Sequence, residues 1–362
     1  MIVYNVLAVL SLLLHPILNN KKLYTGIMSV LLILVAGLRS VNVGTDTLEY
    51  IFLYEKMKNL PLVDSFGIGN HIEIGNMYII FLSSVIYDSP YTFVFFMAFF
   101  TVIILGFFIY RIAGEDYHIA TFVIITFGFY AYLMNAERQA LAIAISCHAI
   151  YYIFQHSYAK AVLICALASC FHLSLIIMLP IVLLLKLFDR ELGHGLRLTI
   201  FFLSSLVVVV TFYYGYNLFF DNPDLLGGRF VGYLDIMDEF NAPREMGLTG
   251  KAFLCICLLT SFVLNLVPVG MEQQRQNFII GFLLLVAVLL MLAQINIIYI
   301  FYRLVDTFSI YLCIGVPFVF RFFRNSYYKD VIMLLFFLMS LVVMNYMGLG
   351  GINGVYPYAF GI

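Results

Sequence analysis

Long apolar stretches separated by short polar segments recur along nearly the whole chain. An α-helix rises about 1.5 Å per residue, so a stretch of about 20 residues crosses the hydrocarbon core of a bilayer. Lipid offers no hydrogen-bond partners to an open strand, so these stretches are expected to be helices. The predicted crossings are Val3–Leu18, Leu23–Arg39, Tyr91–Tyr110, Ile119–Met134, Ala136–Phe154, Leu198–Phe219, Ala252–Val267, Phe278–Ile295, Ile298–Phe320 and Val331–Tyr346.

Two further apolar stretches are ambiguous. Ile74–Tyr87 is short for a full crossing, and it either crosses or dips into the membrane and returns. Ala161–Leu185 is apolar except for His172 and a few small hydroxyls, so it is either one tilted span or two short helices that meet near the histidine. The pattern predicts an all-α, polytopic integral membrane bundle of about 12 transmembrane helices. Residues 1–362 are expected to form a single transmembrane domain, because no linker or fixed repeat interrupts them.

Lysine and arginine residues in short loops predict the orientation, because such loops stay in the cytoplasm. This rule places two long polar loops, about residues 41–73 and 221–250, outside the cytoplasm. The basic segments that fix this orientation are Lys21–Lys22, 186–197 and 321–329.

The chain between the first two basic segments allows two topologies. If 74–87 is re-entrant and 161–185 is a helical pair, Arg111 and Lys160 lie inside and Arg138 lies outside. If each stretch crosses once, all three assignments invert. The first topology keeps more cations in the cytoplasm and is preferred.

Composition agrees with the membrane assignment and excludes other classes. Hydrophobic residues make up 64% of the chain and charged residues 11%, whereas a soluble chain has about 25% charged residues. The net charge of −1 gives no field that would attract nucleic acid. All six cysteines lie in apolar runs, and nucleotide-binding and zinc-protease motifs are absent, so we expect no metal and no cofactor.

Polar side chains within apolar surroundings are the candidates for function. An ionised group at mid-membrane depth costs about 3 kcal/mol or more and is rarely kept without a use. Each candidate also has a structural alternative, as an interfacial anchor, a helix cap, a salt bridge between helices or a packed hydrogen-bond partner. The candidates are Arg39, Asp46, Glu73, Arg138, Gln139, His172, Arg229, Tyr233 and Arg303.

The order of these signals resembles a known family. The resemblance covers nearly the whole chain, although each motif is short. It rests on Ala36–Arg39 with Val43–Thr47 and Tyr50, on Glu73, on Asn135 with Arg138, Gln139 and Ala142, on Phe171–His172 with Ser174, on Arg229 with Tyr233, on Arg303, and on Tyr356–Phe360. In these features the chain resembles the EpsG type of bacterial exopolysaccharide and O-antigen polymerases, the Wzy proteins.

The resemblance implies a glycosyltransferase that polymerises oligosaccharide repeat units carried on undecaprenyl diphosphate. Donor and acceptor would both be lipid-linked, and the reaction would take place at the periplasmic face of the bacterial inner membrane. The resemblance also implies a fold similar to the class C glycosyltransferases, with a flippase and a chain-length regulator as partners.

The residues can be matched to that chemistry. Arginine binds phosphate oxygens without metal, so Arg138 and Arg303 are assigned to the diphosphate, and Arg39 or Arg229 to the donor glycan. Gln139 and Tyr233 lie beside these residues in the sequence and are assigned to substrate binding. An acceptor hydroxyl needs a base, for which His172 is favoured over Asp46 and Glu73.

Three other functions remain open. A flippase or transporter would usually show two similar halves, which the charged positions do not. A ligase differs only in its acceptor. A membrane scaffold would use the same arginine and histidine residues for structure alone.

Overall fold

The chain folds into helices that form two compact units. The computed structural model describes residues 1–60, 72–187, 247–267, 269–293, 300–323, 327–349 and 354–361, with isolated helical positions between 195 and 210. One unit comprises Met1–Lys186 and Phe323–Ile362, and the other Leu187–Phe322. That residues 1–362 form one domain stays a prediction.

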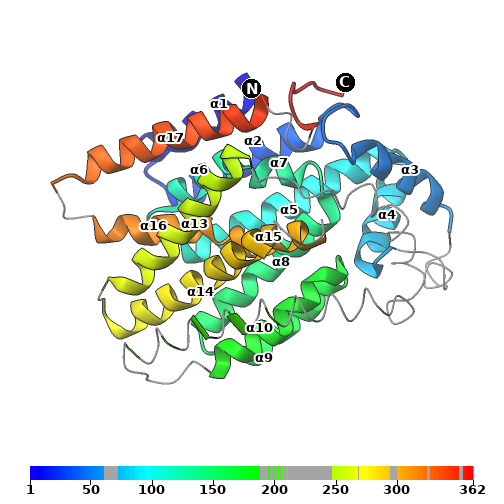
Figure 1. Cartoon of the computed structure of the whole chain (residues 1–362). Coiled ribbons are helices and arrows are strands. Elements are labelled where there is room, and N and C mark those ends of the chain that lie inside the picture. Colours follow the sequence, from blue (N-terminus) through cyan, green and yellow to red (C-terminus); the bar gives the residue numbers. More distant parts are fainter. Residues whose placement is uncertain are drawn as a thin grey trace. The chain divides into compact units, whose positions relative to one another are not determined.

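The first unit is built around α5 and α8, which run side by side (Figure 1). The helix α2 packs on α5, α9 packs on α8, α1 packs on α6, and α3 and α4 both contact α5. The helices are α1 (Ile2–Leu18), α2 (Lys21–Gly37), α3 (Thr47–Met57), α4 (Ile74–Ile86), α5 (Pro90–Ile112), α6 (Tyr117–Thr126), α7 (Phe129–Leu133), α8 (Glu137–Phe154), α9 (Tyr158–Ser169), a 3-10 turn at Leu173–Ile177, α10 (Met178–Leu187) and α17 (Lys329–Leu349).

Local sequence explains where these helices begin and how their polar groups are satisfied. The Asn20 side chain caps α2 by accepting a hydrogen bond from the Leu23 N–H at 3.0 Å. Pro90 occupies the first turn of α5, where its missing N–H costs nothing. Hydroxyls inside the helices donate back to carbonyls of the preceding turn, as Thr101 does to Met97 at 2.7 Å.

One end of the first unit is basic. The Lys21 ammonium lies 4.5 Å from the centre of the Tyr110 ring, and the Arg111 guanidinium lies 5.0 Å from that of Tyr151. Lys160 lies near the same end, with its ammonium 5.8 Å from the centre of the Tyr152 ring. The start of α2, the end of α5 and the end of α8 therefore meet at this end, while the end of α2 and the start of α8 meet at the opposite one.

The structure resolves one of the two ambiguous stretches. The run 161–185 is two helices, α9 and α10, and they are separated by a short break that contains His172. The other stretch is α4, a helix of only 13 residues. The helical pair is the arrangement that the preferred topology requires.

The helices depart from the apolar pattern in three places. Ile119–Met134 is not one helix, because Gly128, at a φ of +84°, ends α6 and starts α7. Ile298–Phe320 is two helices, α15 (Ile300–Ser309) and α16 (Leu312–Phe322). The loop 41–73 contains α3, whose buried face includes two tyrosines. Apolar continuity does not reveal such breaks, and an amphipathic helix of 11 residues reads as a polar loop.

Residues of α3 are tied to the turn that precedes α5. The Asp88 carboxylate accepts hydrogen bonds from the Lys58 ammonium at 3.0 Å and from the Tyr54 hydroxyl at 2.9 Å. These two donors hold the pKa of Asp88 below its ordinary value. The contacts link the end of α3 to the turn before α5.

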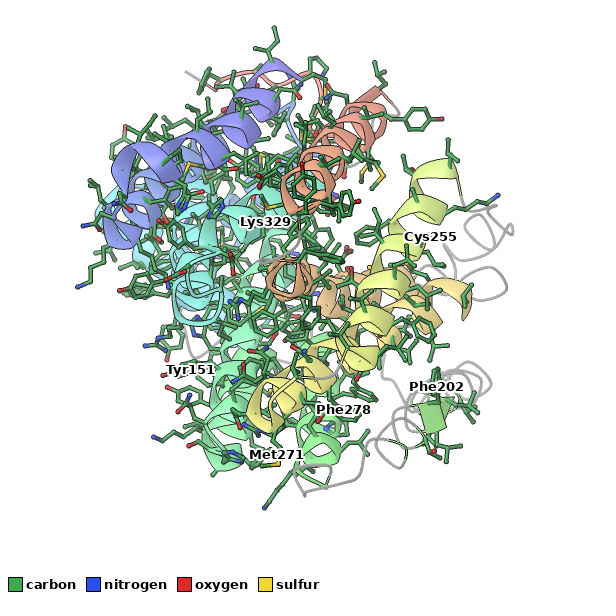
Figure 2. All side chains as sticks on the ribbon, turned by 90° about the vertical axis from the view of Figure 1, so that its left-hand side faces the viewer. Tyr151, Phe202, Cys255, Met271, Phe278 and Lys329 are labelled. Carbon is green, nitrogen blue, oxygen red and sulfur yellow. The ribbon has the colours of Figure 1, made fainter. Side chains whose placement is uncertain are left out.

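The second unit contains α13 (Leu248–Leu266), α14 (Met271–Ala293), α15 and α16. Figure 2 shows Met271 at the start of α14 and Phe278 further along it. The Ser261 hydroxyl of α13 donates to the carbonyl of Gly281 on α14 at 2.7 Å, which joins the two helices closely.

Five described stretches are long and apolar enough to cross a membrane, which identifies a helical membrane protein. They are Pro90–Ile112, Leu248–Leu266, Met271–Leu292, Leu304–Phe322 and Lys329–Leu349. Most of the predicted crossing at 198–219 and of the outer loop at 221–250 lies outside the described residues.

Candidate functional site

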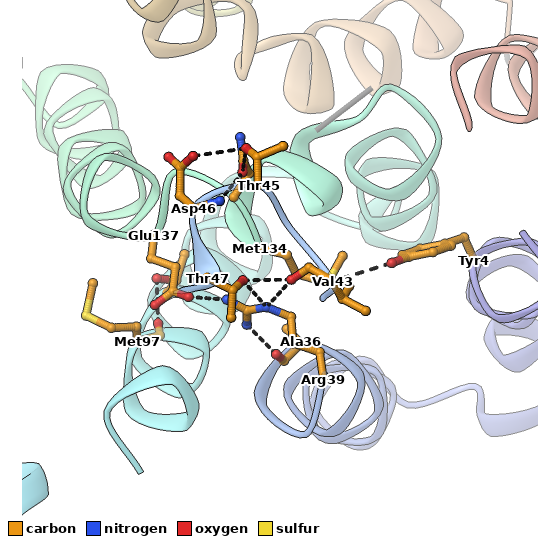
Figure 3. Close-up of polar contacts among 12 residues, drawn as sticks. Tyr4, Ala36, Arg39, Val43, Thr45, Asp46, Thr47, Met97, Met134 and Glu137 are labelled. Carbon is orange, nitrogen blue, oxygen red and sulfur yellow. Dashed lines mark hydrogen bonds and ion pairs between the residues drawn. The ribbon is translucent and has the colours of Figure 1, made fainter. Parts of the chain in front are cut away.

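Arg39 is the centre of a buried polar cluster just beyond the end of α2 (Figure 3). Its Nε donates to the Val43 carbonyl at 3.3 Å and to the Thr47 hydroxyl at 3.2 Å. One terminal nitrogen donates to the Ala36 carbonyl, and the other pairs with the Glu137 carboxylate. The side chain has no exposed surface, and all three of its nitrogens are engaged.

Glu137 is the residue that sequence reasoning missed. It is the first residue of α8 and is 98 positions away from Arg39. Its side chain is only 2% exposed, so the pair is a buried salt bridge. A buried charge that loses its partner is strongly destabilising. A carboxylate beside Arg138 in an apolar context was the only signal in the sequence, and it did not identify the partner.

Asp46 lies beside this cluster, on the loop that leads into α3. Gly44, at a φ of +92°, turns the chain there, and a Cβ on it would lie 2.5 Å from the Met134 carbonyl. The Asn135 side chain accepts from the Asp46 backbone N–H at 3.1 Å and from the Thr45 hydroxyl. The loop is thereby fixed to the residues just before α8.

Arg138 follows Glu137 in the chain and binds a different partner, Glu73. One terminal nitrogen donates to Glu73 Oε2 at 3.0 Å. The Arg138 side chain is 26% exposed and that of Glu73 is 8% exposed. Consecutive residues at the start of α8 therefore make two ion pairs, a closed one with Arg39 and a partly open one with Glu73.

His172 belongs to a segment that packs on the start of α4. The Gly75 N–H donates to the Cys170 carbonyl at 2.8 Å, and the Asn76 amide donates to the Phe171 carbonyl at 2.6 Å. A Cβ on Gly75 would lie 2.7 Å from the Phe171 ring, so only glycine allows this approach. His172 Nδ1 lies 2.7 Å from the Ser174 hydroxyl.

The C-terminal segment, residues 354–361, packs along the loop that carries Arg39. It pairs with that loop through the backbone, with Ser40 N–H donating to Ala359 at 2.8 Å and Gly361 N–H donating to Leu38 at 2.9 Å. The Tyr358 hydroxyl donates to the carbonyl of Val35 on α2 at 2.7 Å. Burial raises the pKa of Tyr358 to about 12, so the hydroxyl stays a donor at neutral pH.

The structure therefore brings together most, though not all, of the predicted site residues. Arg39, Asp46, Glu73, Arg138 and the segment of His172 lie at the end of the unit opposite the basic end, and Gln139 is buried next to Arg138.

The remaining predicted site residues are described only in part. Arg303 lies on α15, where only its backbone is described. Arg229 and Tyr233 lie outside the described residues. Within the described ranges, no three histidine, cysteine, aspartate or glutamate side chains come together as metal ligands.

Comparison with known protein families gives a match over nearly the whole chain. The family model described as EpsG family matches residues 22–360, nearly the whole chain. No curated protein and no solved structure matches the chain. The matched range includes every residue of the buried cluster and most of the C-terminal segment that packs on it. The chain therefore belongs to the EpsG family, a family of Wzy-like polysaccharide polymerases.

Proposed function

We propose that this protein is a glycosyltransferase that joins oligosaccharide repeat units carried on undecaprenyl diphosphate into a surface polysaccharide. The observation that carries the proposal is membership of the EpsG family over residues 22–360. The reaction takes place at the periplasmic face of the bacterial inner membrane, which the chain crosses about 12 times in a fold similar to the class C glycosyltransferases. A flippase supplies the repeat units, and a chain-length regulator acts with the polymerase.

The charge distribution of the first unit supports the periplasmic location of the site. Lys21 and Arg111 share the basic end, and short basic loops stay in the cytoplasm. Arg39 and Arg138 lie at the opposite end, which is then periplasmic. The alternative topology, in which 74–87 and 161–185 each cross once, would place Arg111 outside and Lys21 inside the cytoplasm. Those two side chains would then lie on opposite sides of the membrane, although both lie at the basic end of the unit.

The chemistry needs charge stabilisation and a base. The diphosphate leaves with negative charge, which Arg138 and Arg303 stabilise through paired N–H donors. Arg39 is fully engaged within the protein, so we assign it to positioning the loop of Asp46 and leave the donor glycan to Arg229. The base that accepts the hydroxyl proton is one of Asp46, Glu73 and His172.

Purified protein in proteoliposomes tests the function. A radiolabelled, lipid-linked repeat unit should be converted into a ladder of longer lipid-linked glycans, and Arg138→Ala should abolish the ladder while the protein stays folded. Movement of the label across the membrane without elongation would instead indicate a flippase. Transfer only to an unrelated acceptor would indicate a ligase. A folded protein that does none of these would exclude enzymatic activity.

A further inference from the structure

The contact between Arg138 and Glu73 occupies a carboxylate oxygen that catalysis would need. Glu73 Oε2 accepts hydrogen bonds from Arg138 at 3.0 Å and from the Asn76 amide at 3.3 Å. With Arg138 and Asn76 both donating to it, Oε2 is less accessible to an acceptor hydroxyl than it would be without the arginine. An arginine that is paired with a carboxylate likewise has fewer donors for a phosphate.

We propose that the Arg138–Glu73 ion pair is a latch that the donor diphosphate opens, and that Glu73 is the base that the opening releases. This inference rests on the proposed function. When the diphosphate binds, Arg138 turns from Glu73 to the phosphate oxygens. The same movement places the arginine on the leaving group and opens the side of Glu73 Oε2 that Arg138 covered, while Asn76 still donates to that oxygen.

Arg138 is suited to such a movement, whereas Arg39 is not. The Arg138 side chain is 26% exposed and that of Arg39 is fully buried. Arg138 Nε is buried with no hydrogen-bond partner among the described residues, while Arg39 Nε has two. Turning Arg138 therefore breaks little else, and a phosphate offers the partner that Nε lacks.

Asn76 keeps Glu73 in place when the latch opens. Its amide nitrogen donates to Glu73 and also to the Phe171 carbonyl, so the side chain is held from two sides. Asn76 is fully buried, and its Oδ1 has no hydrogen-bond partner among the described residues. We assign Asn76 as a positioning residue for Glu73. Glu73 is in direct contact with Arg138, and for that reason we propose it as the base in place of His172.

The reaction step is then balanced. The acceptor hydroxyl oxygen forms a bond with the anomeric carbon of the donor sugar, and its proton passes to Glu73. The bond between the anomeric carbon and the phosphate oxygen breaks, and undecaprenyl diphosphate leaves with the bonding electrons. Arg138 stabilises the charge on that product. While the pair is closed, Arg138 limits access to Glu73 Oε2, so binding of the donor and exposure of the base are coupled.

The variant Glu73→Gln separates a latch from a structural ion pair. Removing the competing carboxylate should tighten binding of radiolabelled undecaprenyl diphosphate to the full chain in nanodiscs by up to about fivefold, the size of a partly exposed ion pair. Elongation of lipid-linked glycan should fall by about 10² to 10⁴, the usual contribution of a base. If Glu73 were only structural, binding and elongation would weaken together.

Rescue and control variants complete the experiment. Glu73→Ala should regain elongation with added formate, and Asn76→Ala should lower turnover without changing binding of undecaprenyl diphosphate. Glu272→Gln removes a carboxylate from a more exposed ion pair, that with Arg275, and should change neither quantity. If Glu73→Gln failed to fold, Glu73→Asp would shorten the side chain and should still tighten binding.

Two results overturn the latch. One is unchanged or weaker binding of undecaprenyl diphosphate to Glu73→Gln or Glu73→Asp. The other is elongation by folded Glu73→Gln at the wild-type rate. Failure of the proposed function is distinguishable, because the wild-type protein would then make no longer glycans at all.

Discussion

Removing one partner of the buried Arg39–Glu137 pair should destabilise the protein more than any surface substitution. Arg39→Met leaves the Glu137 charge buried without its counter-ion. It also removes a donor from the carbonyls of Ala36 and Val43, of which Val43 still accepts from the Thr47 hydroxyl. Both side chains of the pair are at most 2% exposed, so solvent does not screen the loss. Breaking a buried ion pair from one side costs about 3–5 kcal/mol of unfolding free energy.

The double variant makes the argument quantitative. Arg39→Met with Glu137→Leu removes both charges, and its cost should be well below the sum of the two single costs because no charge is left unpaired. Reversible unfolding in mixed micelles, followed by the loss of helical signal with denaturing detergent, gives the four free energies of the cycle. Arg275→Met at the pair with Glu272 is the control, and it should cost less than about 1 kcal/mol because Glu272 is exposed. Additive single costs would refute the reasoning, since they would mean that the two charges do not depend on each other.

Three further predictions concern the loop and its surroundings. Gly44→Ala should destabilise the protein, because φ is +92° and the new Cβ would overlap a carbonyl. Gly26 has open space around it in α2, so Gly26→Ala should stabilise the protein by up to about 1 kcal/mol. Thermal unfolding in detergent that ranks the two variants the other way would contradict this prediction. Tyr358→Phe should cost about 1 kcal/mol in the same assay through the lost hydrogen bond to α2, and an unchanged midpoint would show that this bond contributes nothing. Lys58 lowers the pKa of Asp88 in the folded state. The stabilisation by this pair is therefore complete above the ordinary aspartate pKa of about 3.9 and is lost as the pH falls below it. Unfolding midpoints measured across this pH range should show the acid dependence in the wild type and lack this contribution in Asp88→Asn.

The helices were largely predictable from sequence because lipid permits few alternatives. Apolar runs located α1, α2, α5, α8 and α17 to within a few residues. Their interruptions were not predictable in the same way. Gly128 is one small residue in a continuous apolar run, and its positive φ follows from packing rather than from hydrophobicity. The amphipathic α3 was hidden because its buried face contains tyrosines within a polar loop.

The candidate site was predictable in its members and not in its pairings. Arg39, Glu73 and Arg138 each stood out as charges at the edge of apolar runs. Nothing in their spacing shows that Arg39 pairs with Glu137 while the next residue pairs with Glu73, because these contacts join helices that are far apart in the chain. The packing of α2, α4 and α8 on α5 brings the partners together.

The C-terminal segment, residues 354–361, affects which experiments can map the membrane orientation of this protein. Serial truncations fused to a reporter enzyme all lack this segment, and the Gly361 N–H no longer reaches Leu38 in any of them. Such fusions would report the membrane orientation of a chain in which the loop around Arg39 has lost its backbone hydrogen bonds to the C-terminal segment. Reporters inserted into internal loops, with the C-terminal segment retained, measure the orientation of the intact fold instead.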